Sequence, residues 1–282
     1  MNFCTLFNGG KYAMEGWVMA HTLFNHNPSA KLFVLCMDDS VYKEAVRLRN
    51  SYNIEPIHFT DVENRWPELP KSKLGRQLKE YIVSFKPFLP QYIFEKFNES
   101  AVIFVDADIA FWRDASEMFE LFNKCSFFAK DHEIEPARSA GRFNVGLLGY
   151  KNDESCLKWL AWWQEKCIEW CYWRADNGRF AEQGYWNILH NQPQKFEGFL
   201  STDHPGINLA PWNIMKHSIS ANPDGKLLVD GQKLITYHYH EFEVRGDHYF
   251  PTGWVLPQNA RPLLYDPYFK LIKRSISNTL WR

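Results

Sequence analysis

Short apolar segments alternate with helical patterns through the first third of the chain, and this alternation restricts the fold more than any other feature. The apolar runs occupy residues 3–7, 32–37, 56–59 and 101–105. Helical patterns cover residues 13–25, about 40–50 with Ser40 as the cap, 76–86 and 88–97. Strands that alternate with helices form βαβ units, and strands that are apolar throughout are covered on both faces. The sequence therefore predicts an α/β domain with a mixed, mostly parallel central sheet flanked by helices.

Length and charge exclude several classes of protein. The chain has 282 residues and no visible linker, which fits a single domain with a sizeable core. Its formal net charge of -1 lacks the basic excess of nucleic-acid binders, so no nucleic-acid partner is expected. Hydrophobic residues make up 45% of the sequence, a share that excludes disorder and collagen. Aromatic residues reach 17%, and such rings either fill cores or stack on sugars.

The start of the chain and the cysteines bear on localisation. Residues 1–5 show neither a basic region nor an apolar signal core, and no run reaches the roughly 20 apolar residues of a membrane span. The six cysteines form no C-x-x-C pair and are expected to be buried free thiols of a cytoplasmic protein. Cys156, Cys167 and Cys171 share a helical stripe with tryptophans, which favours core packing over a metal site.

The end of the chain is basic and partly apolar. Residues 268–282 follow a predicted domain of residues 1–267 and are expected to form a C-terminal helix or tail. The segment contains Phe269, Lys270, Lys273, Arg274 and Arg282. A helix packed on the domain is the favoured interpretation, and contact with the inner face of an anionic membrane is the alternative.

Two aspartates directly follow the clearest strand. Residues 101–105 are apolar, and Asp106-Ala107-Asp108 comes next. In extended backbone the two carboxylates would point to the same side and repel each other. A hard divalent cation resolves that conflict, and carboxylate oxygens suit Mg²⁺ or Mn²⁺, which keep open positions for phosphate. The sequence therefore predicts a diphosphate–metal site here, with an exposed turn of two solvated aspartates as the structural alternative.

Three further motifs carry side chains that suit a sugar–metal site. On a strand, His238 and His240 would share one face, where an imidazole could complete the metal shell. Asn144 and Gly146 lie in a short apolar run where glycine permits close approach of a substrate to the backbone. Glu182 and Gln183 would begin a helix, where acids are favoured in any case. Satisfied histidines, a plain strand and simple helix-start chemistry are the corresponding structural alternatives.

Basic residues between the third and fourth strands could neutralise phosphate oxygens. Arg76 and Lys79 are three residues apart and would share a helix face, and Lys86 follows on the same segment. Solvated charges on a helix surface are the alternative explanation.

Taken together, these segments resemble the glycosyltransferases of the GT-A (Rossmann-like) fold, and most closely those around glycosyltransferase family 8. The resemblance rests on five motifs in family order: FCTLFNGGKYA, FVDADIAF, FNVGLLGY, FAEQGYWNIL and ITYHYHEF. It implies a hexosyltransferase that moves a sugar from a nucleoside diphosphate sugar, most simply a UDP sugar, to a hydroxyl of a glycan or other acceptor. It also implies Mn²⁺ or Mg²⁺ as cofactor and retention of anomeric configuration. The basic tail at residues 269–282, and not the resemblance, is the ground for a further hypothesis, assembly of a cell-surface glycan at the inner membrane face.

The resemblance also implies roles for individual residues. Asp106 and Asp108 would be metal ligands, with a third ligand from His238 or, alternatively, His240. The remaining predicted contacts concern the donor substrate: Asn8, Gly9 and Tyr12 around the nucleoside, Ala107 and Lys86 near the diphosphate, and Asn144, Gly146, Glu182 and Gln183 around the transferred sugar. Glu182 and Gln183 are the candidate catalytic pair.

Three other functions stay open on the sequence alone. A phosphohydrolase would use Asp106 as nucleophile and Asp108 as acid, although that pair usually stands near the N-terminus. A sugar nucleotidyltransferase would need a glycine-rich loop with a basic residue, for which the segment from Asn8 to Lys11 is short. A non-catalytic carbohydrate-binding module would explain the aromatic content without a metal.

Overall fold

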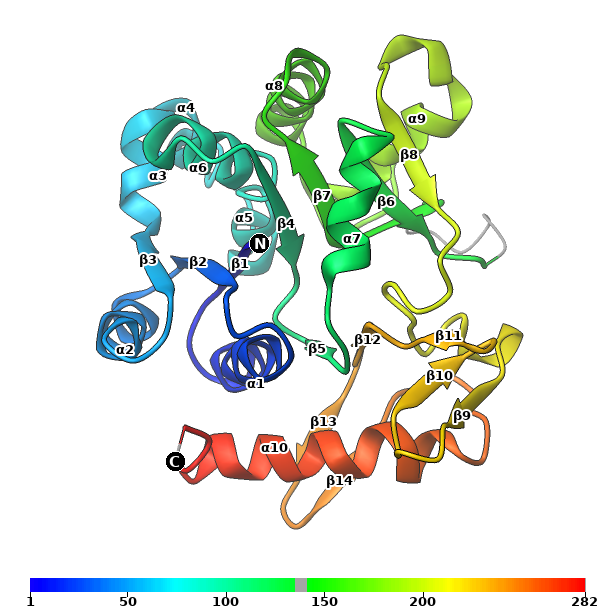
Figure 1. Cartoon of the computed structure of the whole chain (residues 1–282). Coiled ribbons are helices and arrows are strands. Elements are labelled where there is room, and N and C mark those ends of the chain that lie inside the picture. Colours follow the sequence, from blue (N-terminus) through cyan, green and yellow to red (C-terminus); the bar gives the residue numbers. More distant parts are fainter. Residues whose placement is uncertain (135–140, 282) are drawn as a thin grey trace.

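The computed structural model describes residues 1–134 and 141–281, and its centre is a seven-stranded sheet (Figure 1). The strands lie in the order β3-β2-β1-β4-β7-β6-β8. Their bounds are β1 Asn2–Phe7, β2 Lys31–Cys36, β3 Ile54–His58, β4 Ala101–Val105, β6 Phe127–Asp131, β7 Phe143–Lys151 and β8 Phe199–Thr202. Every pairing is parallel except those of β7, which runs antiparallel to both β4 and β6. The predicted mixed, mostly parallel sheet is confirmed.

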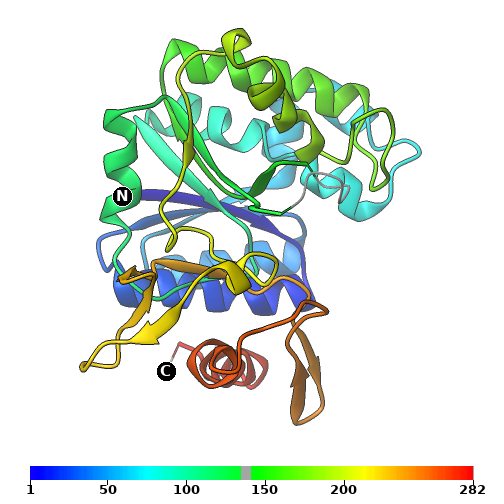
Figure 2. The same cartoon turned by 90° about the vertical axis from the view of Figure 1, so that its right-hand side faces the viewer.

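Helices cover both faces of this sheet, as the two orthogonal views show (Figures 1 and 2). The helices are α1 Lys11–His26, α2 Asp39–Arg49, α3 Phe59–Arg65, α4 Glu68–Lys71, α5 Leu78–Val83, α6 Phe88–Phe97, α7 Ser116–Glu120, α8 Glu154–Glu169, α9 Ile188–Asn191 and α10 Asp266–Ile276. Alternate side chains of one strand enter different cores, because successive residues of a strand point to opposite faces. Ile103 and Val105 of β4 pack toward α1, whereas Val102 and Phe104 pack toward α6 and α8.

Short strands outside the central sheet come mostly from the second half of the chain. β5 (Ile109–Phe111), which directly follows the Asp106–Asp108 segment, pairs antiparallel with β12 (Thr236–His238). The other short strands are β9 Ile219–Ala221, β10 Leu227–Val229, β11 Gln232–Lys233, β13 Glu243–Arg245 and β14 His248–Phe250. The β5–β12 pairing brings His238 beside Asp108, 130 positions earlier in the chain.

Three predictions of local structure were wrong: a helix cap, the bounds of one helix and the backbone conformation of residues 106–108. Asp38, not Ser40, caps α2, because its carboxylate accepts hydrogen bonds from the backbone of Ser40 and Val41. The helix predicted over residues 76–86 is restricted to Leu78–Val83, so Arg76 lies outside it and shares no helix face with Lys79. Residues 106–108 form a turn rather than extended backbone, because the Asp106 carbonyl accepts the Ile109 amide.

The predicted thiol environment is confirmed. All six cysteines are free and buried. Cys156 and Cys167 lie on α8 in an apolar stripe with Trp159 and Trp163, whereas Cys171 follows the end of the helix. Burial raises the pKa of Cys156 and of Cys167, so these two thiols stay protonated and pack as small hydrophobic side chains.

The C-terminal helix α10 lies against α1 on the outside of the domain (Figure 1). Tyr268, Phe269 and Ile272 are buried on its inner face, whereas Lys270 and Lys273 are exposed. The predicted boundary after residue 267 falls in the first turn of this helix, and Arg282 lies outside the described residues. Among residues 1–134 and 141–281, no helix has the length and apolar character needed to cross a membrane.

Candidate active site

A cavity of about 1030 Å³ opens where β1, β4 and β7 meet the short strands. The carboxyl ends of parallel strands are the usual place for a ligand site in such sheets. Of the predicted site residues, those that line it are Asn8, Tyr12, Lys79, Lys86, Asp106, Ala107, Asp108, Asn144, Glu182, Gln183, His238 and His240. Gly9, Arg76 and Gly146 do not line it. The fold therefore brings together most of a residue set drawn from six separate segments.

A buried lysine sits at the centre of the acidic side of the cavity. Lys86 is only 4% exposed, and its Nζ lies 3.0 Å from Asp106 Oδ1 and 3.1 Å from Glu182 Oε1. Burial acts to lower the pKa of Lys86, but the two carboxylates outweigh it and leave the pKa raised. Burial raises the pKa of Glu182 despite the opposing charge of Lys86. Lys86 is therefore a fixed cation between two carboxylates rather than a mobile surface charge.

The two aspartates of the D-x-D motif point to different partners, because the turn between them separates their side chains. Lys86 contacts both oxygens of Asp106, at 3.0 and 3.2 Å. Asp108 instead faces His238, with Oδ1 3.1 Å from Nε2. The like-charge conflict expected for extended backbone is thus relieved by a cation of the chain on one side and an imidazole on the other.

The segment Tyr237–His240 divides its side chains between core and cavity. Tyr237 and Tyr239 are fully buried, and their hydroxyls reach Tyr265 Oη at 2.9 Å and the Leu264 carbonyl at 3.1 Å. His238 and His240 point the other way, into the cavity, as the two-residue period of extended chain requires. The Tyr239 amide donates to the Asp108 carbonyl at 2.7 Å, which fixes this segment beside the aspartate.

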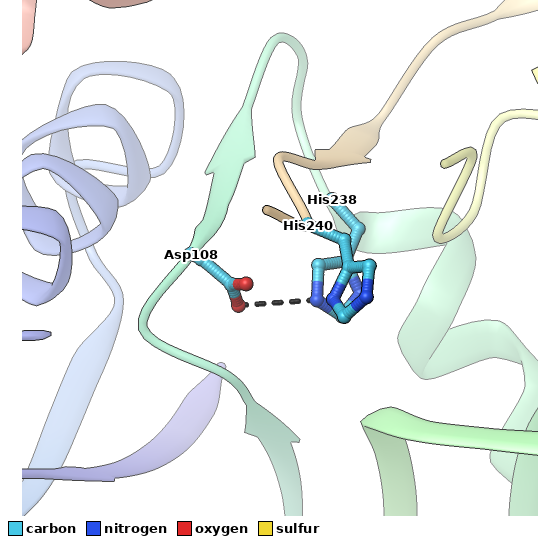
Figure 3. A group of neighbouring side chains, drawn as sticks. All are labelled: Asp108, His238 and His240. Carbon is cyan, nitrogen blue, oxygen red and sulfur yellow. Dashed lines mark ion pairs between the residues drawn. The ribbon is translucent and has the colours of Figure 1, made fainter. Parts of the chain in front are cut away.

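Asp108, His238 and His240 form a compact group of potential metal ligands (Figure 3). One ligand atom from each lies within 4.8 Å of the others. Burial acts against the charge on Asp108, but His238 holds the pKa of this carboxyl well below its ordinary value; reciprocally, Asp108 raises the pKa of His238. A carboxylate with two imidazoles suits a divalent cation, and both ring and carboxylate would be deprotonated to bind it. The donor set therefore fits a metal.

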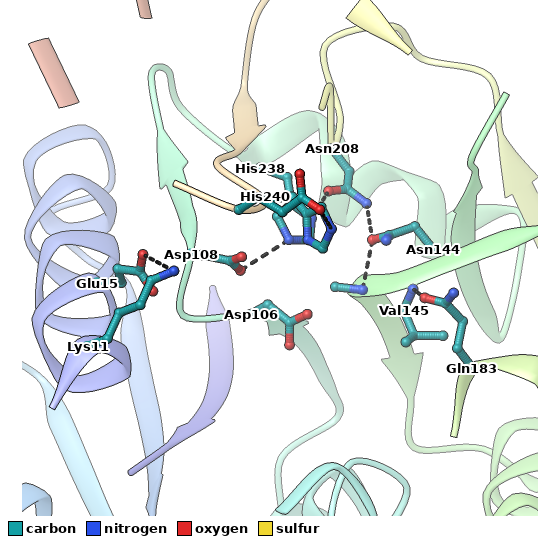
Figure 4. A network of polar contacts seen from close by, with 12 residues as sticks. Lys11, Glu15, Asp106, Asp108, Asn144, Val145, Gln183, Asn208, His238 and His240 are labelled. Atoms are coloured by element: carbon teal, nitrogen blue, oxygen red, sulfur yellow. Dashed lines mark hydrogen bonds and ion pairs between the residues drawn. The ribbon is translucent and has the colours of Figure 1, made fainter. Parts of the chain in front are cut away.

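A chain of amides orients the His238 ring (Figure 4). The Asn208 side chain donates to Asn144 Oδ1 at 2.8 Å, which leaves Asn208 Oδ1 to accept from His238 Nδ1 at 3.3 Å. The Asn144 oxygen also accepts the Gly146 amide at 2.8 Å. This pattern places a proton on Nδ1 and turns Nε2 toward Asp108, where the ion pair needs a second proton that a bound metal would replace. Such outer partners are what fix the tautomer of a metal-binding histidine.

His132 supports the same amide chain from the far side. Its Nδ1 lies 2.9 Å from the Gly141 carbonyl and must donate, so its Nε2 accepts from the Asn144 amide at 3.3 Å. Burial lowers the pKa of His132 to about 4, which keeps the ring neutral as this pattern needs. The Trp212 ring packs edge-on against His132, His238 and His240, with centroids 5.3, 5.1 and 5.4 Å away.

Gly146 lies where three site side chains converge. A Cβ on this residue would stand 2.6 Å from His238 Cε1, 2.9 Å from Asn144 Oδ1 and 3.0 Å from Asp106 Oδ2. The glycine is therefore needed for close packing beneath the site, not for contact with the cavity itself.

The far end of the cavity lies at the start of α1. Asn8 follows β1, and the Tyr12 ring, half exposed, lines the wall one turn later. Gly9 is held back from the cavity because its amide donates to Asp38. Glu15 is only 1% exposed, and neither of its oxygens has a hydrogen-bond partner among the described residues, although Lys11 Nζ lies 3.6 Å away (Figure 4).

The remaining predicted residues have separate surroundings. Arg76 donates to the Ile168 carbonyl at 2.7 Å and to Ser84 at 2.8 Å, so it joins the end of α8 to α5. Lys79 lies over the Trp173 ring, 4.7 Å from its centroid, at the cavity wall. Gln183 Oε1 lies 3.4 Å from the Val145 amide and so reaches the first residues of β7.

Several side chains of the site escaped prediction from the sequence. Trp173, Trp212 and Trp254 line the cavity, and Asn208 and His132 orient its ligands. The high aromatic content left core packing and sugar contact both open, and it did not show which rings line the cavity. Asn208 has a positive φ of 55°, which asparagine tolerates better than most residues, but a lone asparagine in a loop gives no sequence signal.

Comparisons with known proteins relate the chain to relatives of unassigned activity. No protein-family model matches the sequence. YfnF of Bacillus subtilis (strain 168) is 28% identical over 255 residues, covering 86% of this chain and 82% of the relative. YfnD of the same strain is 28% identical over 270 residues, covering 92% and 84%. Both are described as uncharacterized proteins.

Similarity to solved structures establishes the fold of this chain. The galactosyltransferase LgtC, in complex with donor and acceptor sugar analogues, superposes with a TM-score of 0.59 over 94% of this chain and 100% of its own, at 17% identity. Mouse xyloside xylosyltransferase 1 gives 0.55 over 86% and 98%, at 12% identity. The chain has the GT-A fold. At such low identity these structures establish the fold alone.

Proposed function

We propose that this chain is a metal-dependent glycosyltransferase of the family 8 type, which moves a sugar from a UDP sugar to a hydroxyl acceptor. The observation that carries the proposal is the shared cavity of the Asp108–His238–His240 group and the buried Lys86–Asp106–Glu182 network. Together they offer a divalent-cation site next to a fixed positive charge, and both face a space large enough for a nucleotide sugar. The GT-A fold favours a glycosyltransferase over a phosphohydrolase or a sugar-binding module.

Departure of a nucleoside diphosphate builds negative charge on phosphate oxygen. A divalent cation bound by Asp108 and His238, with Asp106 close by, would stabilise that charge as it develops. Lys86 adds a second positive charge that needs no reorganisation, because two carboxylates already hold it in place. The chain's own contribution is thus a prearranged positive field at one end of the cavity.

The other predicted residues divide between the two halves of the donor. Asn8 and the exposed Tyr12 ring would receive the nucleoside at the α1 end. Asn144, Glu182 and Gln183 would surround the transferred sugar. Glu182 is tied to Lys86 and nearly fully buried, so it suits hydrogen bonding to sugar hydroxyls better than removing a proton from an acceptor. A leaving phosphate that takes the acceptor proton, with retention of configuration, is the mechanism we favour.

Thermal shift with nucleoside diphosphates tests the first half of the proposal. UDP with Mn²⁺ should raise the melting temperature, because a ligand that binds only the folded state stabilises it. Asp108→Asn should remove the shift, whereas Glu165→Gln on the outer face of α8 should keep it. If no nucleoside diphosphate shifts the wild-type melting temperature with any divalent cation, a nucleotide-sugar transferase is the wrong assignment.

Product analysis tests the second half. Incubation with UDP sugars and a panel of simple glycoside acceptors should release UDP, and NMR of the product would give the anomeric configuration. Retention is the expected outcome. Inversion would mean that a carboxylate, and not the leaving phosphate, acts as the base that removes the acceptor proton. Hydrolysis of an aryl phosphate that is blocked by Asp106→Asn would instead favour the phosphohydrolase.

We extend the proposal to a cytoplasmic enzyme that assembles a cell-surface glycan at the inner membrane face. Lys270 and Lys273 are exposed on α10, and Ile276 at its end is 54% exposed, a pattern that supports peripheral contact with anionic lipid. Lys270→Glu/Lys273→Glu should then reduce sedimentation with anionic vesicles and leave the melting temperature unchanged. Equal sedimentation of the two proteins would remove the membrane part of the proposal.

A further inference from the structure

We infer that the acceptor is a glycan joined through phosphate to a hydrocarbon chain, and that the mouth of the cavity binds this phosphate and the adjoining part of the chain. The inference rests on the proposed function, because it names the class of acceptor for that reaction. The surface that carries it, here called the amphipathic rim, consists of Leu74, Leu78, Lys79, Trp173 and Arg174. Of these residues, Leu78, Lys79 and Trp173 line the cavity.

Three large apolar side chains of the rim are exposed. Leu74, Leu78 and Trp173 are 90%, 58% and 45% exposed, respectively. Single exposed apolar side chains are common on soluble proteins, but a group of them beside a cavity is typical of a binding surface. Since Leu78 and Trp173 also line the cavity, the exposed apolar surface continues into it. A ligand that enters the cavity across the rim therefore gains affinity from an apolar part.

A buried carboxylate fixes the two segments of the rim to each other. Glu80 on α5 is 6% exposed, its Oε1 accepts the Trp173 amide, and its Oε2 accepts the Gln77 amide, both at 2.7 Å. The Lys79 side chain crosses the same junction and lies over the Trp173 ring. The rim is therefore a preformed surface, and a ligand does not have to order it.

The two cations of the rim have no carboxylate partner among the described residues. Lys79 and Arg174 are exposed, and Arg174 lies over the Tyr172 ring, 5.2 Å from its centroid. Asp176, two residues further on, is paired with Arg179 at 2.5 Å, and the carboxylate that joins the two segments already accepts two amides. The rim therefore presents positive charge beside apolar surface, which complements a ligand with an anionic group next to an apolar one.

The rim adjoins the part of the cavity that we assign to the transferred sugar. The Trp173 ring packs against Phe180, with centroids 5.4 Å apart, and Phe180 stands two residues before Glu182. Phe180, Glu182 and Gln183 all line the cavity, whereas the nucleoside is expected at the opposite end, at Tyr12. An acceptor hydroxyl has to meet the transferred sugar, so an acceptor bound here leaves its non-reacting end on the rim.

The chemistry of the linkage identifies the anion as phosphate. A group that joins a glycan to a hydrocarbon chain forms a bond to each of them. A carboxylate loses its charge when it forms one ester bond, whereas a phosphate that forms two ester bonds keeps a negative charge. Its oxygens then accept hydrogen bonds from guanidinium and ammonium groups such as those of Arg174 and Lys79. Leu74, Leu78 and the Trp173 ring receive the hydrocarbon beside it.

The test compares three probes on the full chain by calorimetry, with a chelator present and below micelle-forming concentrations. The probes are octyl phosphate, octyl glucoside and inorganic phosphate. Octyl phosphate should bind about tenfold or more tightly than inorganic phosphate, since burial of two methylene groups is worth about that factor. It should bind about threefold or more tightly than octyl glucoside, because exposed ion pairs contribute modestly. In the transfer assay it should compete with the acceptor and not with the UDP sugar.

Variants of the rim separate its charged and apolar parts. Lys79→Gln/Arg174→Gln should weaken octyl phosphate binding by about threefold or more and leave octyl glucoside binding unchanged. Trp173→Ala should weaken the binding of both octyl compounds, since it removes apolar contact area. Lys195 provides a matched control, because it is also exposed and lies over a tryptophan ring, that of Trp162 at 4.9 Å, but does not line the cavity. Lys195→Gln should bind octyl phosphate like the wild type.

Equal octyl phosphate affinity of wild type and Lys79→Gln/Arg174→Gln, both with wild-type melting temperatures, would overturn the inference. Competition with the UDP sugar would assign the rim to the donor and overturn it as well. Loss of sedimentation with anionic vesicles in the double variant, without loss of octyl phosphate binding, would make the rim a bilayer contact instead. In each case a melting shift with UDP and Mn²⁺ would leave the proposed function intact. Selective octyl phosphate binding without any response to nucleotides would support the rim as a binding surface and count against the proposed function.

Discussion

The Tyr239 and Tyr268 rings stack face to face, with centroids 3.6 Å apart and planes only 4° from parallel. Tyr239 lies between the two histidines of the cavity, and Tyr268 belongs to α10. The C-terminal helix therefore supports the back of the segment whose front carries His238 and His240. The helix α10 contributes no residue to the cavity wall, but it thus helps to position the candidate metal ligands.

This stack gives a prediction with a matched control. Tyr268→Ala should lower the free energy of unfolding by about 3–5 kcal/mol, as loss of a buried aromatic side chain does, and should weaken Co²⁺ binding because Tyr239 loses its support. The Tyr268 hydroxyl has no hydrogen-bond partner among the described residues, so Tyr268→Phe should be neutral or slightly stabilising. Urea denaturation and metal titration measure both effects. A Tyr268→Phe variant as unstable as Tyr268→Ala would show that the hydroxyl, not the stack, matters.

Gly146 provides a prediction about packing beneath the ligands. Gly146→Ala places a methyl group 2.6 Å from His238 Cε1, so the ring has to move. We expect a loss of about 1–3 kcal/mol of stability from overpacking and a fall of about tenfold or more in Co²⁺ affinity. Near-UV circular dichroism and Co²⁺ absorption report the two separately. Wild-type Co²⁺ affinity in the folded variant would mean that the His238 ring adjusts without cost.

Lys86 gives a prediction about buried charge. Lys86→Met leaves Asp106 and Glu182 without their shared cation, and removal of one partner from a buried ion pair costs about 3–5 kcal/mol. Adding Glu182→Gln should recover part of that stability, because one of the two unpaired charges is gone. Urea denaturation of the metal-free single and double variants measures the difference. If the double variant is less stable than Lys86→Met, charge imbalance is not the cause of the loss.

The sequence was a good guide wherever the signal is local. The apolar runs at residues 3–7 and 101–105 are β1 and β4, because a strand covered on both faces must be apolar throughout. The alternation in Tyr237–His240 correctly assigned the two histidines to one face, since a two-residue period is a property of extended backbone alone.

The sequence was a poor guide wherever a partner comes from far along the chain. Lys86 was expected near the donor, but its ion pairs with Asp106 and Glu182 depend on the packing of α5 and the segment before β8. Asn208 carries no motif, and its role follows only from the position of His238 and Asn144 beside it. The turn at residues 106–108 was missed because its side-chain directions depend on these long-range contacts.

Glu15 is a buried carboxyl whose ionisation opposes folding. Burial, with a further contribution from the charge of Asp108, raises the pKa of Glu15 to about 8. In the unfolded chain the same group ionises near its ordinary value of 4.5. Between these two values the unfolded state releases the proton more readily than the folded state. The free energy of unfolding therefore falls as the pH rises from about 4.5 to about 8.

Glu15→Gln should remove this penalty. Relative to the wild type, the variant should gain stability progressively between pH 5 and pH 8, by about 2–4 kcal/mol at the upper end, and show no gain below the unfolded pKa. Urea denaturation at several pH values with a chelator present measures the gain, because a bound cation would offset the charge of Asp108. Glu165→Gln, at an exposed carboxylate of α8, should follow the pH dependence of the wild type and differ from it by a small, nearly constant amount over the same range. A gain for Glu15→Gln that does not change with pH would show that the amide fits the site better for reasons other than charge.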